Sequence, residues 1–146
     1  MSYLHIQRLA SVRDEYAVVS AATTYLARVW HELGDEPEVS ELRFSQLRRA
    51  IMNLEATFIV RLFSEFEGIL YHHLAVRHPR LRIPRTAEAL ISRVSVREHI
   101  PDLLRDAAQD VREYRNAIVH RPTGPMASMS FSEVLAALNR FLVQLP

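Results

Sequence analysis

The sequence predicts an all-α fold, an up-and-down helical bundle of four main helices plus one short helix. Every long apolar pattern repeats with a period near 3.6, as in an amphipathic helix, and none alternates with the period of two typical of a half-buried strand. The breaks between these patterns are short, which favours antiparallel neighbouring helices. The length of 146 residues is close to that of one ordinary domain, so residues 1–146 are expected to form a single helical domain.

Prolines, glycines and capping residues mark the expected ends of the helices. Gly34–Pro37 and Arg121–Pro125 are clusters of helix-breaking residues that predict loops. Ser130 followed by Glu133 is a capping-box signature, which predicts the start of a last helix. The expected helical segments are 6–33, 44–76, 86–96, 101–120 and 130–142.

Apolar residues spaced three and four apart predict the buried face of each helix. In the first segment this stripe extends from Ile6 to Leu33, which predicts one continuous buried face. Aromatic residues at the same spacing are expected in the core rather than as platforms for stacking bases. They are Tyr16, Trp30, Phe44, Phe58, Phe63 and Phe66.

The composition excludes several classes of protein. There is no cysteine, which excludes disulfides, thiolate catalysis and the commonest structural zinc sites. The three glycines, Gly34, Gly68 and Gly124, are isolated, which excludes a glycine-rich phosphate loop. No stretch approaches the roughly eighteen uncharged apolar residues of a membrane span, and nothing indicates secretion. A cytoplasmic protein without a membrane partner is expected.

Three neighbouring histidines, His72, His73 and His78, raise the question of a metal site. Adjacent side chains on a helix point about 100° apart, and no carboxylate stands at ligand spacing with these histidines in the sequence. No metal and no cofactor are therefore expected.

Arginine supplies all 18 basic residues, and the formal net charge is only +1, so any binding of nucleic acid must be local. The basic residues concentrate in residues 77–121, and the run 77–85 contains two prolines that should keep it extended and exposed. This run is either a solvated loop or a guide for an RNA backbone. The candidate RNA-binding residues are Arg77, Arg80, Arg82, Arg85, Arg112 and Arg121.

The end of the helix expected at 101–120 carries the candidate chemistry. Arg115 stands where the apolar stripe would place an apolar residue, and a guanidinium there is costly unless it is paired. Asn116 and His120 are four apart and share one helix face, toward which Arg115 can lean. An arginine, a carboxamide and a histidine at an exposed helix end can hold a phosphate and move a proton. The alternative is structural: Arg115 pairs with Glu65 or Glu67 of the long second helix, and His120 is a solvated helix cap.

The segment Arg115–His120 resembles the motif of HEPN ribonucleases, in which an arginine, usually followed by a polar residue, precedes a histidine by four to six intervening residues. The upstream run Phe63–Leu70 is similar to the acidic, aromatic middle helix of such domains. The resemblance covers about residues 44–142, and only the six residues of the motif are specific. It implies a helical bundle with the motif at the end of a late helix.

The resemblance also implies a mechanism without metal. Arg115 would hold the scissile phosphate, Asn116 would orient a phosphate oxygen, and His120 would act as general acid or base. The RNA 2′-hydroxyl would attack the phosphorus and leave a cyclic phosphate end. A homodimer would join two motifs across a shared cleft, and the protein would be a toxin or defence effector with RNA as its substrate.

One position departs from the HEPN pattern. Toxins that a partner nucleotidyltransferase silences commonly carry a tyrosine two residues after the histidine, and this chain has Pro122 there. Inactivation by nucleotidylation of such a tyrosine is therefore not expected, whereas a protein antitoxin or other regulatory partner remains compatible with the sequence. Two other functions stay open, a catalytically silent helical module for dimerisation or partner binding, and nucleotide binding without cleavage.

Overall fold

The computed structural model describes residues 2–33, 43–120 and 128–146 and confirms the predicted all-α bundle. Five helices and no strand are found within these ranges. The loops predicted at Gly34–Pro37 and Arg121–Pro125 lie outside the described residues. The helices are α1 (Ser2–Leu33), α3 (Phe44–Arg77), α4 (Ala87–Arg97), α5 (Asp102–His120) and α6 (Phe131–Leu142).

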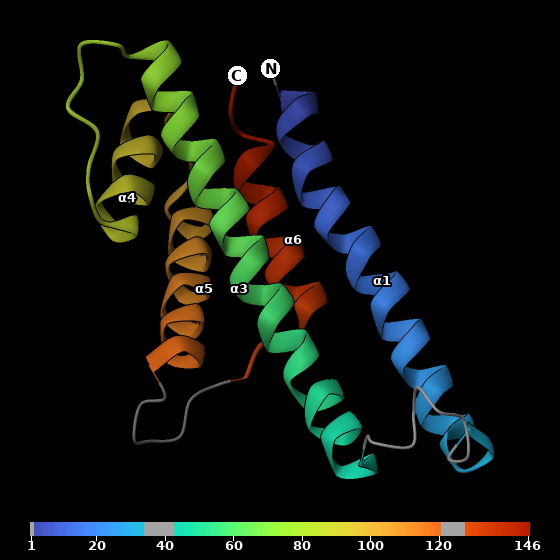
Figure 1. The fold of residues 1–146 in the computed structure, drawn as a ribbon. Coiled ribbons are helices and arrows are strands. Elements are labelled where there is room, and N and C mark those ends of the chain that lie inside the picture. Colours follow the sequence, from blue (N-terminus) through green and yellow to red (C-terminus); the bar gives the residue numbers. More distant parts are fainter. Residues whose placement is uncertain (1, 34–42, 121–127) are drawn as a thin grey trace.

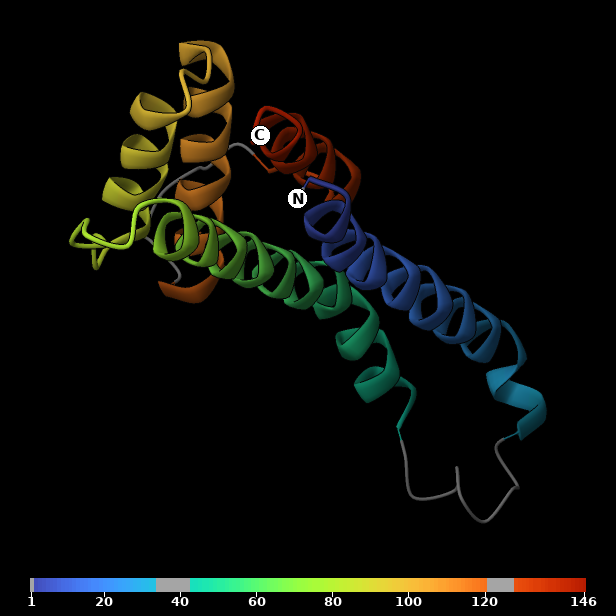
Figure 2. The same ribbon diagram turned by 90° about the horizontal axis from the view of Figure 1, so that it is seen from above.

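The four main helices alternate in direction along the bundle, as an up-and-down topology requires (Figure 1). Helix α1 lies against α3, and α5 and α6 pack against each other and against the second half of α3. The short helix α4 runs parallel to α3, because the segment 78–86 first returns along the side of the bundle. Seen from above, α3 crosses the molecule between α1 and the α4–α5 pair (Figure 2).

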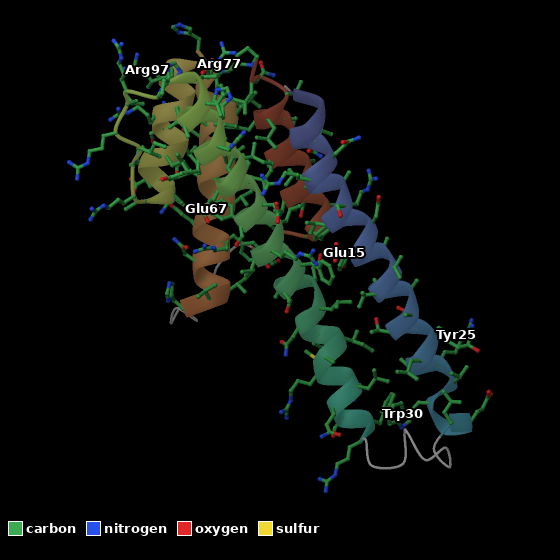
Figure 3. The ribbon with its side chains drawn as sticks, turned by 45° about the horizontal axis from the view of Figure 1, so that its top comes forward. Glu15, Tyr25, Trp30, Glu67, Arg77 and Arg97 are labelled. Atoms are coloured by element: carbon green, nitrogen blue, oxygen red, sulfur yellow. The ribbon has the colours of Figure 1, made fainter. Side chains whose placement is uncertain are left out.

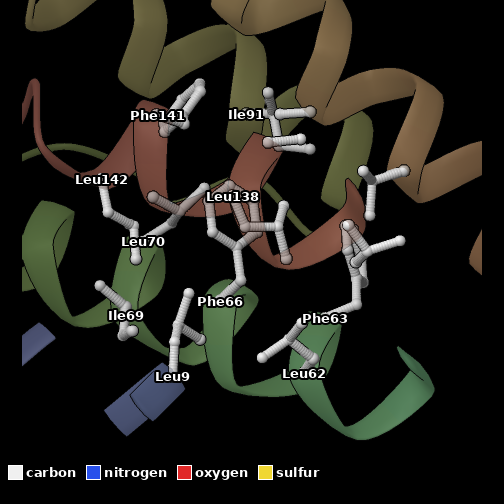
Figure 4. Close-up of a cluster of buried hydrophobic side chains, with 14 of the residues drawn as sticks. Leu9, Leu62, Phe63, Phe66, Ile69, Leu70, Ile91, Leu138, Phe141 and Leu142 are labelled. Atoms are coloured by element: carbon white, nitrogen blue, oxygen red, sulfur yellow. The ribbon is translucent and has the colours of Figure 1, made fainter. Parts of the chain in front are cut away.

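The hydrophobic core gathers around the second half of α3 (Figure 4). Phe63 and Phe66 are fully buried, and the ring of Phe66 meets Phe141 of α6 edge to face, with 5.4 Å between the ring centroids. Leu9 of α1 and Ile91 of α4 close the cluster from two sides. Because every helix contributes to this one core, the end of α5 is held in a defined position beside α3.

The prediction of a continuous buried face on α1 is wrong for its second half. Only Leu9 and Val12 are buried among the described side chains of this helix. Farther along the predicted stripe Val19 is exposed, and Thr23, Leu26 and Trp30 are only half-buried. Phe44, predicted in the core, is 43% exposed and contacts Trp30 instead, with 5.9 Å between the ring centroids. The second half of α1 and the first part of α3 form a two-helix arm, residues 17–33 and 44–57, that extends beyond α6 (Figures 1 and 2).

Local capping fixes where the shorter helices begin. Ser130 Oγ accepts a hydrogen bond from the Glu133 backbone at 3.3 Å, and Glu133 Oε2 accepts one from the Ser130 backbone at 2.8 Å. The predicted capping box is thereby confirmed. The side chain of Thr86 caps α4, and α4 ends in a tight turn at His99, whose φ of 54° lies in the left-handed region. This turn reverses the chain into α5.

Among the described residues, no helix combines the length and the apolar character that crossing a membrane requires.

Candidate functional site

Arg115 is the centre of the candidate site, and its guanidinium is held against α3. Its Nη2 donates a hydrogen bond to Oε2 of Glu67 at 3.2 Å, and its Cζ lies 5.3 Å from the centroid of the Phe63 ring. Phe63 and Glu67 are four residues apart and therefore lie on the same face of α3. The arginine at an apolar position of α5 is thus paired, as its burial requires.

The guanidinium also reaches Asn116 on its own helix. Arg115 Nη1 donates to Oδ1 of Asn116 at 2.9 Å, and the Arg115 side chain is 25% exposed. Arg115 Nε is buried and has no hydrogen-bond partner among the described residues. The arginine is therefore oriented by three groups, Glu67, Phe63 and Asn116, while a quarter of its surface stays open to a ligand.

His120 is the last residue of α5 and is exposed. It follows Asn116 by four positions and so shares its helix face. The end of α5 therefore carries an imidazole exposed to solvent, and among the described residues no hydrogen bond joins it to Arg115 or Asn116. Such a group can give or take a proton from a bound ligand.

Burial, opposed by the charge of Arg115, raises the pKa of the Glu67 carboxyl. The desolvation of this partly buried carboxylate thus outweighs the attraction of the arginine. Glu67 was one of two acidic partners that the sequence offered for Arg115. The other, Glu65, pairs instead with Arg8 of α1, with 2.6 Å between Oε2 and Nη2.

The six candidate RNA-binding arginines do not form one group. Arg77 is the last residue of α3, and Arg80 follows it in the 78–86 segment, near the start of α5. His120 lies at the opposite end of the 19-residue α5, roughly 28 Å away along the helix axis. Figure 3 shows Arg77 and Arg97 together at that far end of the bundle. Arg85 lines a cavity that Glu67 also lines, so it lies on the side of the candidate site. Arg82 is exposed between them.

The remaining two arginines differ from each other. Arg112 is only 17% exposed, and its donors meet Gln109 Oε1 at 2.7 Å and Glu113 Oε1 at 3.1 Å, so its charge is largely engaged within α5. Arg121 lies outside the described residues.

Sequence reasoning missed a second polar cluster at the far end of the bundle. The sequence suggested no carboxylate near the histidines, but α4 brings Glu98 to them. Its Oε1 lies 2.8 Å from Nε2 of the fully buried His73 and 3.3 Å from Nε2 of His78. His72 is exposed. Within the described ranges, no group of three or more acidic or histidine side chains is arranged to hold a metal ion.

Glu98 is stabilised as a carboxylate by these contacts. Burial alone would raise the pKa of its carboxyl, but hydrogen bonds with His73 and His78 and the charge of Arg77 hold that pKa below its usual value. The only sequence signal was the presence of an acidic residue at the end of a short helix, which does not reveal its partner.

No protein-family model matches the chain, and no similar protein was found among curated proteins or among solved structures.

Proposed function

We propose that this protein is a metal-independent endoribonuclease of the HEPN type, with Arg115, Asn116 and His120 as its catalytic residues. The observation that carries the proposal is the hydrogen bond of 2.9 Å between Arg115 Nη1 and Asn116 Oδ1. It gathers a guanidinium and a carboxamide at the open end of α5, on the helix face that His120 shares.

The proposed reaction uses the RNA as its own nucleophile. The 2′-oxygen attacks the neighbouring phosphorus, the bond from phosphorus to the 5′-oxygen breaks, and the products are a 2′,3′-cyclic phosphate and a 5′-hydroxyl. A base takes the proton of the 2′-hydroxyl and an acid gives one to the departing 5′-oxygen. Arg115 stabilises the negative charge that develops on the phosphate, and Asn116 orients one of its oxygens.

Each chain supplies one histidine at the end of α5, whereas the reaction uses both a base and an acid. We therefore propose a homodimer in which two α5 ends share a cleft on a two-fold axis. In light scattering at micromolar concentration, the protein should have twice the 16.9 kDa mass of one chain. A strict monomer that still cuts RNA would refute the shared cleft and leave the catalytic residues in place.

The biological role that fits this chemistry is that of a cytoplasmic toxin or defence effector, controlled by an antitoxin or another regulatory protein. Control by a protein partner is preferred to nucleotidylation, because Pro122 occupies the position where silenced HEPN toxins carry a tyrosine.

The direct test is cleavage of end-labelled single-stranded RNA in excess EDTA. The protein should cut RNA, leave DNA of the same sequence intact and produce cyclic phosphate ends. His120→Ala should slow cleavage at least about a hundredfold, as for other general acid-base residues. His72→Ala, which changes an exposed histidine on α3, is the matched control and should cut as fast as the wild type. Cleavage that depends on an added divalent metal, or full activity of His120→Ala, would contradict the proposal.

A catalytically silent helical module is the second candidate, and one observation favours it. The same guanidinium that would bind a phosphate already meets Glu67 and the Phe63 ring, as a purely structural arginine would. In that case Arg115 serves the stability of the bundle, and replacing His120 has no consequence for any activity.

A further inference from the structure

An open cavity of about 560 Å³ is lined in part by Glu67, the hydrogen-bond partner of Arg115. It is formed by α3, the end of the 78–86 segment and the start of α4. Ile83, Pro84 and Leu90 give it an apolar wall, while Glu67, Tyr71 and Arg85 give it polar groups. Its volume is within the range of about 300–1,000 Å³ that small-molecule sites occupy.

Glu67 connects this cavity to the candidate catalytic residues. Its Oε2 accepts the hydrogen bond from Arg115, and the same side chain lines the cavity. A ligand in the cavity is therefore separated from the guanidinium by a single carboxyl group. One RNA strand that placed a phosphate on Arg115 would bring a neighbouring nucleotide to this cavity.

Tyr71 offers a flat aromatic surface there. It follows Glu67 by one helical turn on the same face of α3, and it is 55% exposed. Aromatic side chains that face solvent beside a basic residue are the usual platforms on which single-stranded bases stack. Arg85, at the opposite wall, supplies a cation for a phosphate oxygen.

Glu67 also provides a hydrogen-bond acceptor for a ligand. Its second oxygen, Oε1, has no hydrogen-bond partner among the described residues. A carboxylate oxygen accepts hydrogen bonds from the amino groups of cytosine, adenine and guanine. Uracil has no amino group, and its single N–H is flanked by two carbonyl oxygens that a carboxylate repels.

We propose that this cavity is a nucleobase subsite for the residue next to the scissile phosphate. Tyr71 stacks on the base, Glu67 accepts a hydrogen bond from its amino group, and Arg85 contacts the adjoining phosphate. The subsite selects guanine, cytosine and adenine over uracil. This inference rests on the proposed ribonuclease function, but the binding that it describes is measurable without cleavage.

The test is a titration of the full-length protein with the four nucleoside monophosphates, followed through the ring signals of its five tyrosines by NMR. The Tyr71 signal is identified as the one that Tyr71→Phe removes. It should shift with the guanosine, cytidine and adenosine compounds and shift least with uridine monophosphate. Tyr71→Ala should weaken binding about tenfold, whereas Tyr71→Phe keeps the stacking surface and should change it by less than about twofold. Tyr25→Ala, which removes a tyrosine of similar exposure on α1, is the matched control.

Cleavage products give an independent readout. The wild type should cut beside bases that carry an amino group, and Tyr71→Ala should lose this preference while it still cuts RNA. If no nucleotide shifts the Tyr71 signal, or if Tyr71→Ala binds and selects like the wild type, the subsite is wrong even where cleavage is observed. If nucleotides bind at Tyr71 and the protein cuts no RNA, the subsite stands as a nucleotide-binding site and the proposed ribonuclease function falls.

Discussion

Arg115 and Glu67 are 48 positions apart in the sequence, yet Nη2 of the arginine lies 3.2 Å from Oε2 of the glutamate. The pair joins the end of α5 to the middle of α3, and both side chains are about three-quarters buried. Because burial raises the pKa of Glu67 more than the charge of Arg115 lowers it, the carboxylate is a costly partner. The contribution of Glu67 is to orient the guanidinium of Arg115.

Substitutions of Glu67 should separate its role as a hydrogen-bond acceptor for Arg115 from the effect of its negative charge. Glu67→Ala leaves a largely buried guanidinium without an acceptor and should lower the free energy of unfolding by about 1–3 kcal/mol. Glu67→Gln keeps an acceptor and should cost less than about 1 kcal/mol in urea unfolding at pH 7. The pKa of Glu67 is raised in the folded state, so the folded state holds the proton more tightly than the unfolded state does. The free energy of unfolding of the wild type should therefore fall, relative to that of Glu67→Gln, as the pH rises from the unfolded-state pKa of about 4.3 through the folded-state pKa.

Glu65→Ala is the control for this comparison, because Glu65 belongs to the more exposed pair with Arg8. It should cost no more than about 1 kcal/mol. Equal losses for Glu65→Ala and Glu67→Ala would show that the pair of Arg115 with Glu67 adds nothing particular to stability.

Arg115 itself distinguishes a ribonuclease from a structural module. Arg115→Lys keeps the positive charge near Glu67 but loses the planar fork that also reaches Asn116. In the ribonuclease, this variant should fold and be nearly inactive in single-turnover cleavage, while thermal unfolding stays close to that of the wild type. A lysine variant that cuts RNA at the wild-type rate would remove Arg115 from the proposed chemistry.

The contacts of Glu98 predict a stability that depends on pH. The folded-state pKa of Glu98 is lowered, so its ionised form stabilises the fold above the unfolded-state value of about 4.3, and this contribution is lost as the pH falls through the lower folded-state pKa. Glu98→Ala also leaves the buried His73 without its partner and should cost about 1–3 kcal/mol at pH 7. In chemical unfolding, the difference in free energy of unfolding between Glu98→Ala and the wild type should become smaller below about pH 4. A difference that is constant between pH 3 and 7 would contradict this account.

The aromatic residues of α3 should differ sharply in their contribution to stability. Phe66 is fully buried between Phe63 and Phe141, so Phe66→Ala should lower the free energy of unfolding by about 3–5 kcal/mol. Phe44 is 43% exposed on the arm, and Phe44→Ala should cost less than about 1.5 kcal/mol. Similar losses for the two variants would mean that the arm is packed as tightly as the core.

The helices could be predicted from the sequence because their signals are local. The capping box of Ser130 and Glu133 and the stop after Leu33 each depend on a few neighbouring residues. For the partner of Arg115 the sequence left two candidates, Glu65 and Glu67. Residues two positions apart on a helix point about 200° away from each other, so the choice between them depends on which neighbouring helix covers which face of α3. Helix α1 lies on the Glu65 side and α5 on the Glu67 side.

Two features could not be read from the sequence, for physical reasons. Glu98 meets His73 because the 78–86 segment returns along the bundle before α4 begins, and helical periodicity carries no information about that path. The apolar stripe of α1 has the same period in both halves, but the 12 residues of α6 span only about 18 Å against about 48 Å for the 32 residues of α1. The apolar stripe of α1 is therefore longer than α6, the helix that covers its first half.

The arm has a further consequence for how the protein opens in solution. None of the described side chains in residues 17–33 or 44–57 is buried, so this pair of helices is anchored chiefly where α1 and α3 enter the core. Its backbone amides should exchange with deuterium through local opening, well before those of residues 58–74, which exchange only when the whole bundle unfolds. In this exchange experiment α1 and α3 should therefore each contribute to two cooperative units of unequal stability, and the part of α5 with buried side chains, which ends at Val111, should belong to the slower unit.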